Sequence, residues 1–181
     1  MDWKYFLPNI TSEIPGVPVS VAISKLKEAV REFCRKSWVW RVKEEVVTDE
    51  QFTPVEVDDA DIIAISDIKG YSDKSFGYNP TYKELELNSS PDKELTLEVT
   101  FVIMPKANAP ECPDWLAENH KEGIEAYAKF LLASMRSREW FFPDQAYAFR
   151  NEFHRLVAGA RIDKVKQGTG RSLRVKARRF V

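Results

Sequence analysis

The sequence predicts an α+β protein: a three-helix core, interrupted by a small antiparallel β-domain and followed by an extended basic C-terminal arm. Apolar residues recur with a period near 3.6 up to Ser37 and again after Pro105, and with a period near 2 between them. The chain has 181 residues, of which 44% are hydrophobic, so it can bury a core. We therefore expect a helical core over residues 1–37 and 106–167, a β-domain over 38–105 and an arm over 168–181.

The first expected helix covers residues 18–36. Its apolar residues recur every three or four positions, so they form one stripe, and charged residues fill the other face. Pro18 fits the helix start, because the first turn has no partner for the backbone donor that proline lacks. The apolar positions are Val19, Ala22, Ile23, Leu26, Ala29, Val30 and Phe33.

Residues 38–105 are rich in β-branched and aromatic residues and are broken by turn formers, a pattern typical of short strands. In the last expected strand apolar and polar residues alternate, which predicts one buried face and one wet face. Five short strands indicate a small sandwich or a curled sheet. The expected strands are 38–47, 52–57, 62–68, 83–87 and 95–104, with breaks at 48–50, 58–59, 70, 77–80 and 88–92.

Two further helices are expected at residues 113–136 and 143–167. The apolar stripe of the first is wider than one neighbour requires, so we expect it to pack on the other helices and on an adjacent subunit. Gly168 is a natural stop for the second. The aromatic residues between the two helices should plug the end of the helix pair; they are Trp140, Phe141 and Phe142.

The residues that could carry catalysis or bind a metal are few. His120 and His154 are the only histidines, and neither has a partner at ligand or triad spacing. Cys34 and Cys112 are far apart in the sequence and predict buried, reduced thiols. A run of aspartates lacks the glycine and terminal glutamate of a calcium loop, which favours a solvated turn; its members are Asp58, Asp59, Asp61 and Asp67. We predict no enzyme activity, no cofactor and no metal site.

Charge is strongly polarised along the chain. The whole chain has a net charge of −1, residues 161–181 contain eight basic and one acidic residue, and residues 1–160 contain 19 basic and 27 acidic residues. A short block of like charge is typical of an arm that orders on a partner, either an acidic protein surface or a nucleic acid. The expected contact residues alternate cations with apolar side chains: Arg171, Leu173, Arg174, Lys176, Arg178, Arg179 and Phe180.

Two aromatic residues alternate at the start of the first expected strand, in Trp38-Val39-Trp40-Arg41. Such rings either stack nucleobases or pack at a domain junction, and the sequence leaves both open. The chain has no run of about 18 apolar residues, and its start lacks the pattern of a secretory signal. We therefore expect a protein made in the cytoplasm without membrane association.

Several motifs together resemble the head-to-tail adaptor proteins of tailed bacteriophages, also called neck or connector proteins. The likeness covers nearly the whole chain, and it rests on structural motifs without a catalytic signature. The motifs are Ile14-Pro15-Gly16-Val17-Pro18, the helix end at 29–37 followed by Trp38-Val39-Trp40-Arg41, Pro105, Pro113-Asp114-Trp115-Leu116, Gly123-Ile124-Glu125-Ala126, Leu131-Leu132, Trp140, Pro143, Ala146, Phe153 and Arg178-Arg179-Phe180.

This resemblance implies a structural protein of the virion, located at the head-tail interface. Such adaptors form a homo-oligomeric ring, usually dodecameric, beneath the portal protein. Genomic DNA passes through the ring without sequence-specific contact, the arm docks on the portal, and a tail or nozzle protein binds below. The β-domain is similar to that of adaptors from short-tailed phages. The alternative from the residues alone is a nucleic-acid-binding module that uses the basic arm.

Overall fold

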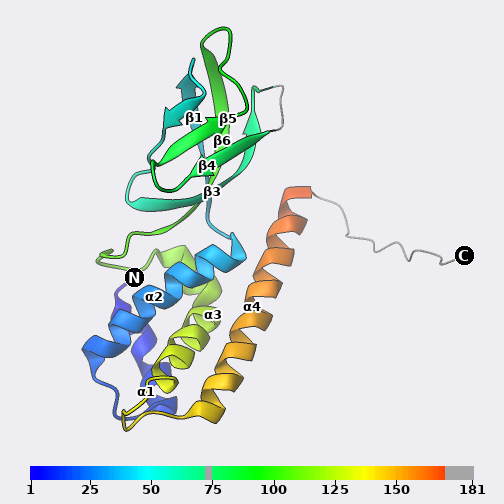
Figure 1. Cartoon of the computed structure of the whole chain (residues 1–181). Coiled ribbons are helices and arrows are strands. Elements are labelled where there is room, and N and C mark those ends of the chain that lie inside the picture. The colour runs from blue at the N-terminus through cyan, green and yellow to red at the C-terminus, as the bar shows by residue number, and fades with distance from the viewer. Residues whose placement is uncertain (72–74, 170–181) are drawn as a thin grey trace, which may run out of the picture.

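The structure is a computed structural model that describes residues 1–71 and 75–169. It confirms the α+β class: helices form one end of the molecule and strands the other (Figure 1). The helices are η1 (Trp3–Phe6), α1 (Leu7–Glu13), α2 (Val19–Ser37), α3 (Asp114–Ala133) and α4 (Pro143–Thr169). The strands are β1 (Arg41–Thr48), β2 (Phe52–Pro54), β3 (Ala60–Lys69), β4 (Phe76–Asn79), β5 (Glu84–Leu87) and β6 (Leu95–Pro105).

The N-terminal segment is helical, which the sequence analysis missed. The 3-10 helix η1 continues into α1, and the described part of the chain therefore has four α-helices, one more than expected. Helices of seven residues are too short to be stable by themselves, so α1 depends on tertiary packing. That packing is supplied by four fully or almost fully buried side chains: Trp3, Phe6, Ile10 and Ile14.

Helix α2 lies almost where its apolar stripe predicts. Its buried residues include Leu26, Val30 and Phe33, while its opposite face carries charged side chains. Trp38, directly after the helix, has a φ of 57°, a left-handed conformation that turns the chain out of the helical region and into the strands.

Helices α3 and α4 form an antiparallel pair against α2 (Figure 1). Helix α3 ends at Ala133, three residues before the predicted end, and it is kinked at His120, whose φ and ψ are −132° and 19°. Helix α4 continues through Gly168 to Thr169, so the predicted stop at Gly168 is wrong. One glycine near a helix end lowers helix stability by only about 1 kcal/mol, which does not force termination.

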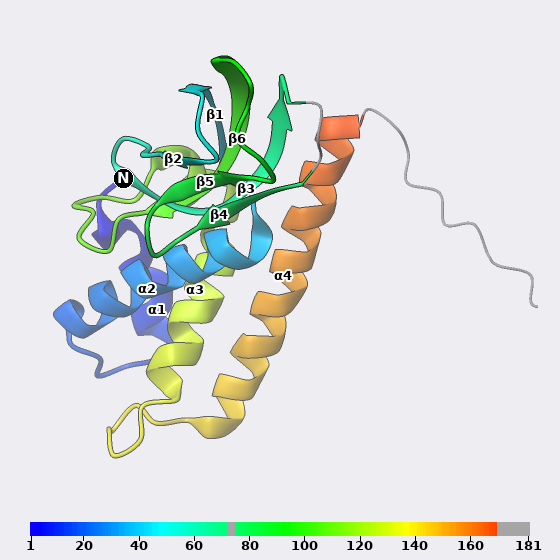
Figure 2. The same ribbon diagram turned by 45° about the horizontal axis from the view of Figure 1, so that its top comes forward.

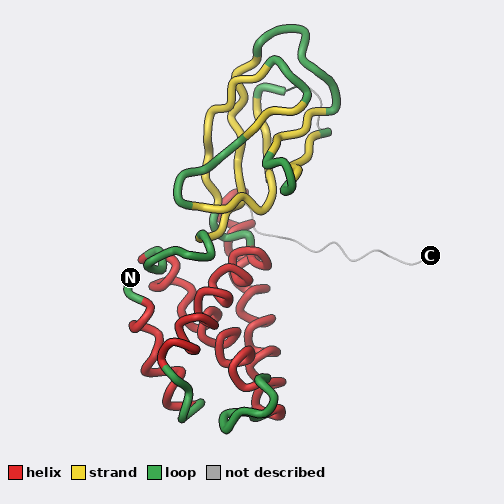
Figure 3. The backbone as a smooth tube through the Cα atoms, turned by 60° about the vertical axis from the view of Figure 1, so that its left-hand side comes forward, coloured by secondary structure: helices red, strands yellow, loops and turns green. Residues whose placement is uncertain are grey.

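The strands form two three-stranded antiparallel sheets, with orders β1-β6-β3 and β2-β5-β4 (Figure 3). Between them lies an apolar cluster that includes Leu85, Leu87, Leu97, Val99 and Phe101, so the arrangement is a small sandwich. Of the two arrangements expected from the sequence, a small sandwich or a curled sheet, the strands therefore form the sandwich.

Two details of the strands differ from prediction. Strand β4 occupies Phe76–Asn79, where residues 77–80 were expected to form a break; its antiparallel pairing with β5 overrides the low strand propensity of glycine and asparagine. Strand β6 has a wet face only in its first half. Val102 and Met104 are buried although they lie on the face expected to be wet, because β6 is the central strand and its end packs against α2.

Trp40 joins the cores of the helical and strand regions. It packs against both apolar clusters, and its ring lies 5.8 Å from that of Trp115 in an edge-to-face arrangement. The sequence left open whether the tryptophans before β1 stack nucleobases or pack at a domain junction, and Trp40 packs at the junction. Helix α4 rises past the other helices and ends level with the lower edge of the strands in Figure 1; in the turned view of Figure 2 its end lies beside the strands.

Candidate functional site

The predicted contact residues of the arm lie outside the described residues. They are Arg171, Leu173, Arg174, Lys176, Arg178, Arg179 and Phe180. The structure fixes only the point from which the arm leaves, at the end of α4 beside the strand region (Figures 1 and 2). Candidate sites on the described residues are therefore surfaces of the helices and the two sheets.

The two histidines lie on different helices and do not form a site together. His120 sits at the kink of α3, with its ring 5.0 Å from Phe33 and 6.1 Å from Trp115. His154 is exposed on α4. Among the residues that the structure describes, no three His, Cys, Asp or Glu side chains are placed to hold a metal ion.

Both cysteines are buried free thiols in the helical core. Burial raises the pKa of the Cys34 thiol well above its usual range and raises the pKa of Cys112 to about 12. A thiol with a raised pKa holds little thiolate at neutral pH, so neither side chain is suited to act as a nucleophile.

One of the predicted solvated aspartates has a structural role instead. Asp61 accepts a hydrogen bond of 2.7 Å from the Nη1 atom of Arg31, which also donates to the carbonyl of Pro105. Arg31 thus links α2 to β3 and to the end of β6. The pairing joins residues 30 positions apart and forms, with Trp40, the contact between the helical and strand regions.

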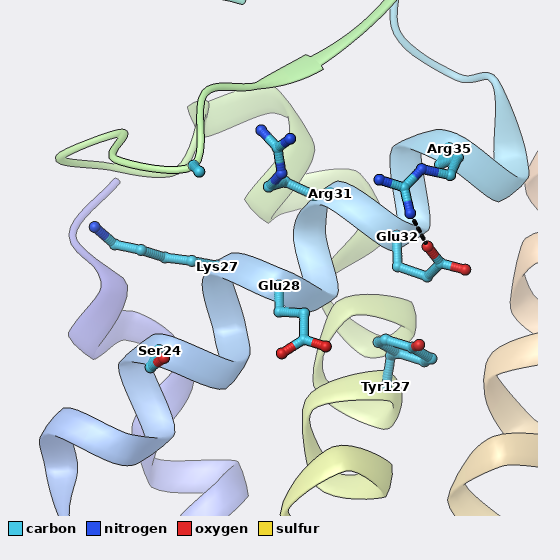
Figure 4. Close-up of a pocket in the computed structure, with 8 residues that line it drawn as sticks. Ser24, Lys27, Glu28, Arg31, Glu32, Arg35 and Tyr127 are labelled. Carbon is cyan, nitrogen blue, oxygen red and sulfur yellow. Dashed lines mark hydrogen bonds and ion pairs between the residues drawn. The ribbon is translucent and has the colours of Figure 1, made fainter. Parts of the chain in front are cut away.

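A charged groove of about 500 Å³ follows the exposed side of α2 (Figure 4). Its acids and bases pair locally: Arg35 with Glu32 at 2.7 Å, and Lys25 beside the groove with Glu28 at 2.8 Å. Such a surface, with both signs of charge, suits a contact with another protein more than a contact with nucleic acid phosphates. The groove is lined by Ser24, Lys27, Glu28, Arg31, Glu32, Arg35, Ala107 and Tyr127.

The acidic charge of the chain is concentrated in the strand region. Residues 38–105 contain six basic and fifteen acidic residues, a net charge of −9. The remaining residues up to position 160 contain 13 basic and 12 acidic residues, so the helical region is nearly neutral. The charge count of the sequence identified an acidic body, but the strands carry that acidity rather than the whole body.

A second candidate surface lies at the end of the α3-α4 pair. Trp140 is buried there as expected, but Phe141 and Phe142 remain 37% and 36% exposed, so they do not plug the helix pair as predicted. Tyr147 beside them is 68% exposed. Phe141, Tyr147 and two arginines border a shallow hollow of about 280 Å³, which is lined by Phe130, Ser134, Arg136, Phe141, Pro143, Ala146, Tyr147 and Arg150.

The wide apolar stripe of α3 is covered within the same chain. Helix α3 packs against α1, α2 and α4, and polar side chains of the N-terminal segment complete the contact. The Asn9 amide donates to both carboxylate oxygens of Glu125 at 3.2 and 3.1 Å, and Lys129 pairs with Glu13 at 2.6 Å. The same chain thus buries Leu116, Ile124 and Leu132, whereas Tyr127, Phe130 and Met135 are only partly buried, so the expected contact with an adjacent subunit stays a prediction.

No protein-family model matches the chain, and no curated protein matches it in sequence. None of the described helices is long and apolar enough to cross a membrane.

Proposed function

We propose that this chain is a structural head-to-tail adaptor of a tailed bacteriophage. Copies of the chain assemble into a ring beneath the portal protein, DNA passes through the ring, and the basic arm of residues 168–181 docks on the portal. A tail or nozzle protein binds the opposite side of the ring.

The separation of charge is the observation that carries this proposal. A nearly neutral helical region bears a strand region of net charge −9 and, at the end of α4, a basic arm. An acidic wall does not bind DNA phosphates, so it allows DNA to slide past, whereas a wall of lysine and arginine would hold it. A cationic arm with interleaved apolar residues suits an acidic groove on another protein.

The exposed surfaces also favour an assembling protein. The aromatic rings and arginines at the end of the α3-α4 pair are the residue types that protein interfaces prefer. The charged groove on α2 offers a second, different surface. A closed ring built from one kind of subunit needs two such unlike faces, because each copy meets its two neighbours through different residues.

The proposal is tested by co-purification with the portal protein of the same phage. The full chain and a chain ending at Thr169 are compared, and the shorter chain keeps every described core residue. We expect the full chain to co-purify with portal rings, and the amount of the shorter chain retained on them to be at least tenfold lower. Equal retention of the two chains would contradict the assigned role of the arm.

The competing function, nucleic-acid binding by the arm, is tested by mobility shift at two salt concentrations. Five phosphate contacts predict a loss of affinity of roughly 500-fold between 50 and 200 mM salt. We expect instead weak binding of double-stranded DNA at both concentrations. Tight binding at low salt that is lost in the chain ending at Thr169 would support the nucleic-acid-binding alternative.

A further inference from the structure

The outer faces of the two sheets differ in how their charges are paired. On the β1-β6-β3 sheet, Glu98 lies between two lysines, 3.1 Å from the Nζ atom of Lys43 and 2.8 Å from that of Lys69. These hydrogen bonds lower the pKa of the Glu98 carboxyl. Glu98 is therefore already neutralised by partners in the same sheet, whereas Glu45, which lies opposite it on β1, has no ion pair among the described residues.

The β2-β5-β4 sheet presents acids that have no such partners. Glu84 and Glu86 alternate on β5 with the buried Leu85 and Leu87, so both carboxylates point to the outer face. Among the described residues, no ion pair joins either glutamate to a cation; Glu86 accepts only a neutral hydrogen bond of 2.9 Å from the amide of Asn79.

Apolar groups border these two acids. In the register of the sheet, Phe52 lies opposite Glu86, and Pro54 lies opposite Glu84. Phe52 is 48% exposed, and Tyr82, in the turn between β4 and β5, is 70% exposed. The face thus combines regularly spaced carboxylates with exposed rings, which is the complement of a peptide that alternates cations with apolar residues.

The C-terminal segment of this chain has that composition. Residues 170–181 contain five cations and no acid, and Leu173-Arg174-Val175-Lys176-Ala177-Arg178 alternates apolar and basic residues with a period of two. In an extended peptide, side chains two positions apart lie on one side, about 6.6 Å from each other. Glu84 and Glu86 have the same spacing on β5, so successive cations of the segment match successive carboxylates of the sheet.

We propose that the outer face of the β2-β5-β4 sheet is a docking surface for residues 170–181 of the chain. The segment starts directly after α4, which ends beside the strand region (Figures 1 and 2). Twelve extended residues reach up to about 40 Å, which exceeds the length of any strand in the sheet. This docking requires no portal protein, so its test is independent of the test of the adaptor function.

The test uses the full chain with a fluorophore attached at Ser172→Cys. Both native cysteines are buried, so the label attaches selectively. Anisotropy of the label reports whether the arm is held. At about 50 mM salt we expect Glu84→Gln/Glu86→Gln to lower the anisotropy to the value that about 500 mM salt produces in the parent, because salt screens exposed ion pairs.

The matched control is Glu44→Gln/Glu45→Gln, which removes the same charge from exposed positions on β1 in the other sheet. We expect it to change the anisotropy less than a quarter as much. Equal effects of the two double variants, or no effect of either, would overturn the proposal.

A second measurement does not depend on variants. Carbodiimide joins a lysine to a carboxylate only when the two are in contact. In the full chain we expect Lys176 to be linked to Glu84 or Glu86, as identified by mass spectrometry. Cross-links of Lys176 that avoid both glutamates would refute the assigned surface even if a variant proved unstable.

Discussion

Two helical glycines give opposite predictions for the same substitution. A Cβ atom added at Gly123 in α3 would lie 2.5 Å from the Cε2 atom of Phe33, against an ordinary contact of at least 3.4 Å. A Cβ atom at Gly159 in α4 meets nothing within 4 Å. Gly123→Ala should therefore destabilise the protein, whereas Gly159→Ala should stabilise it.

The magnitudes follow from packing and helix propensity. The ring of Phe33 is 1% exposed and is enclosed by His120 at 5.0 Å and Phe153 at 6.3 Å, so it has little room to move. Overpacking costs roughly 1–3 kcal/mol, and alanine regains about 1 kcal/mol of helix propensity over glycine. We expect a net loss of up to about 2 kcal/mol for Gly123→Ala and a gain of about 0.5–1 kcal/mol for Gly159→Ala.

Urea unfolding followed by circular dichroism measures both changes. With an m value of roughly 2 kcal/mol per molar urea, the midpoint of Gly159→Ala should lie above that of Gly123→Ala by up to about 1.5 M. Adding Phe33→Leu should relieve part of the loss in Gly123→Ala, because the smaller side chain leaves room for the methyl group. A Gly123→Ala protein as stable as Gly159→Ala would refute the close packing of α2 on α3.

Three further predictions concern the junction, the N-terminal contact and the thiols. Arg31→Ala should lower the free energy of unfolding by about 1.5–3 kcal/mol, because it leaves Asp61 and a backbone carbonyl without their charged donor. The control Arg35→Ala removes an exposed ion pair and should lower it by under about 0.5 kcal/mol. Equal losses of the two variants in urea unfolding would contradict this difference. Burial raises the pKa of the Glu125 carboxyl above its ordinary value of 4.5, so the folded protein holds this proton more tightly than the unfolded chain does. The parent should therefore lose stability relative to Glu125→Gln as the pH rises from 4.5 towards neutrality. A stability difference between the two proteins that is constant with pH would refute this prediction. Both buried thiols should be unreactive towards a disulfide reagent in the native protein and should react fully in urea. A thiol that reacts with the reagent within minutes in the native protein would contradict their burial.

The sequence predicted the elements whose pattern is strong and local. Helix α2 has seven apolar residues at helical spacing, and β6 has a long alternating run, so both were placed to within a few residues. Helix α1 and strand β4 were missed because their stability comes from partners: α1 from burial of Ile10 and neighbouring residues, and β4 from pairing with β5.

The interaction surfaces were less predictable than the fold. The basic arm is visible in the sequence because its five cations lie within nine residues and no acid lies among them. The ion pair between Arg31 and Asp61 joins residues 30 positions apart, and no local sequence pattern predicts it. The width of the α3 stripe predicted contacts with the other helices and an adjacent subunit, but no local pattern indicated that Asn9 and Glu13 of the N-terminal segment would also contact α3. Counting charges by region would have located the acidic surface on the strands.

Electron microscopy of the full chain mixed with its portal protein tests the central claim most directly. Our account predicts a closed ring of this chain beneath the portal, coaxial with the DNA channel. It also predicts a channel wall without a continuous belt of lysine and arginine, since such a belt would retard DNA. Single copies bound away from the channel axis, or a ring whose lumen is lined by basic residues, would contradict the account.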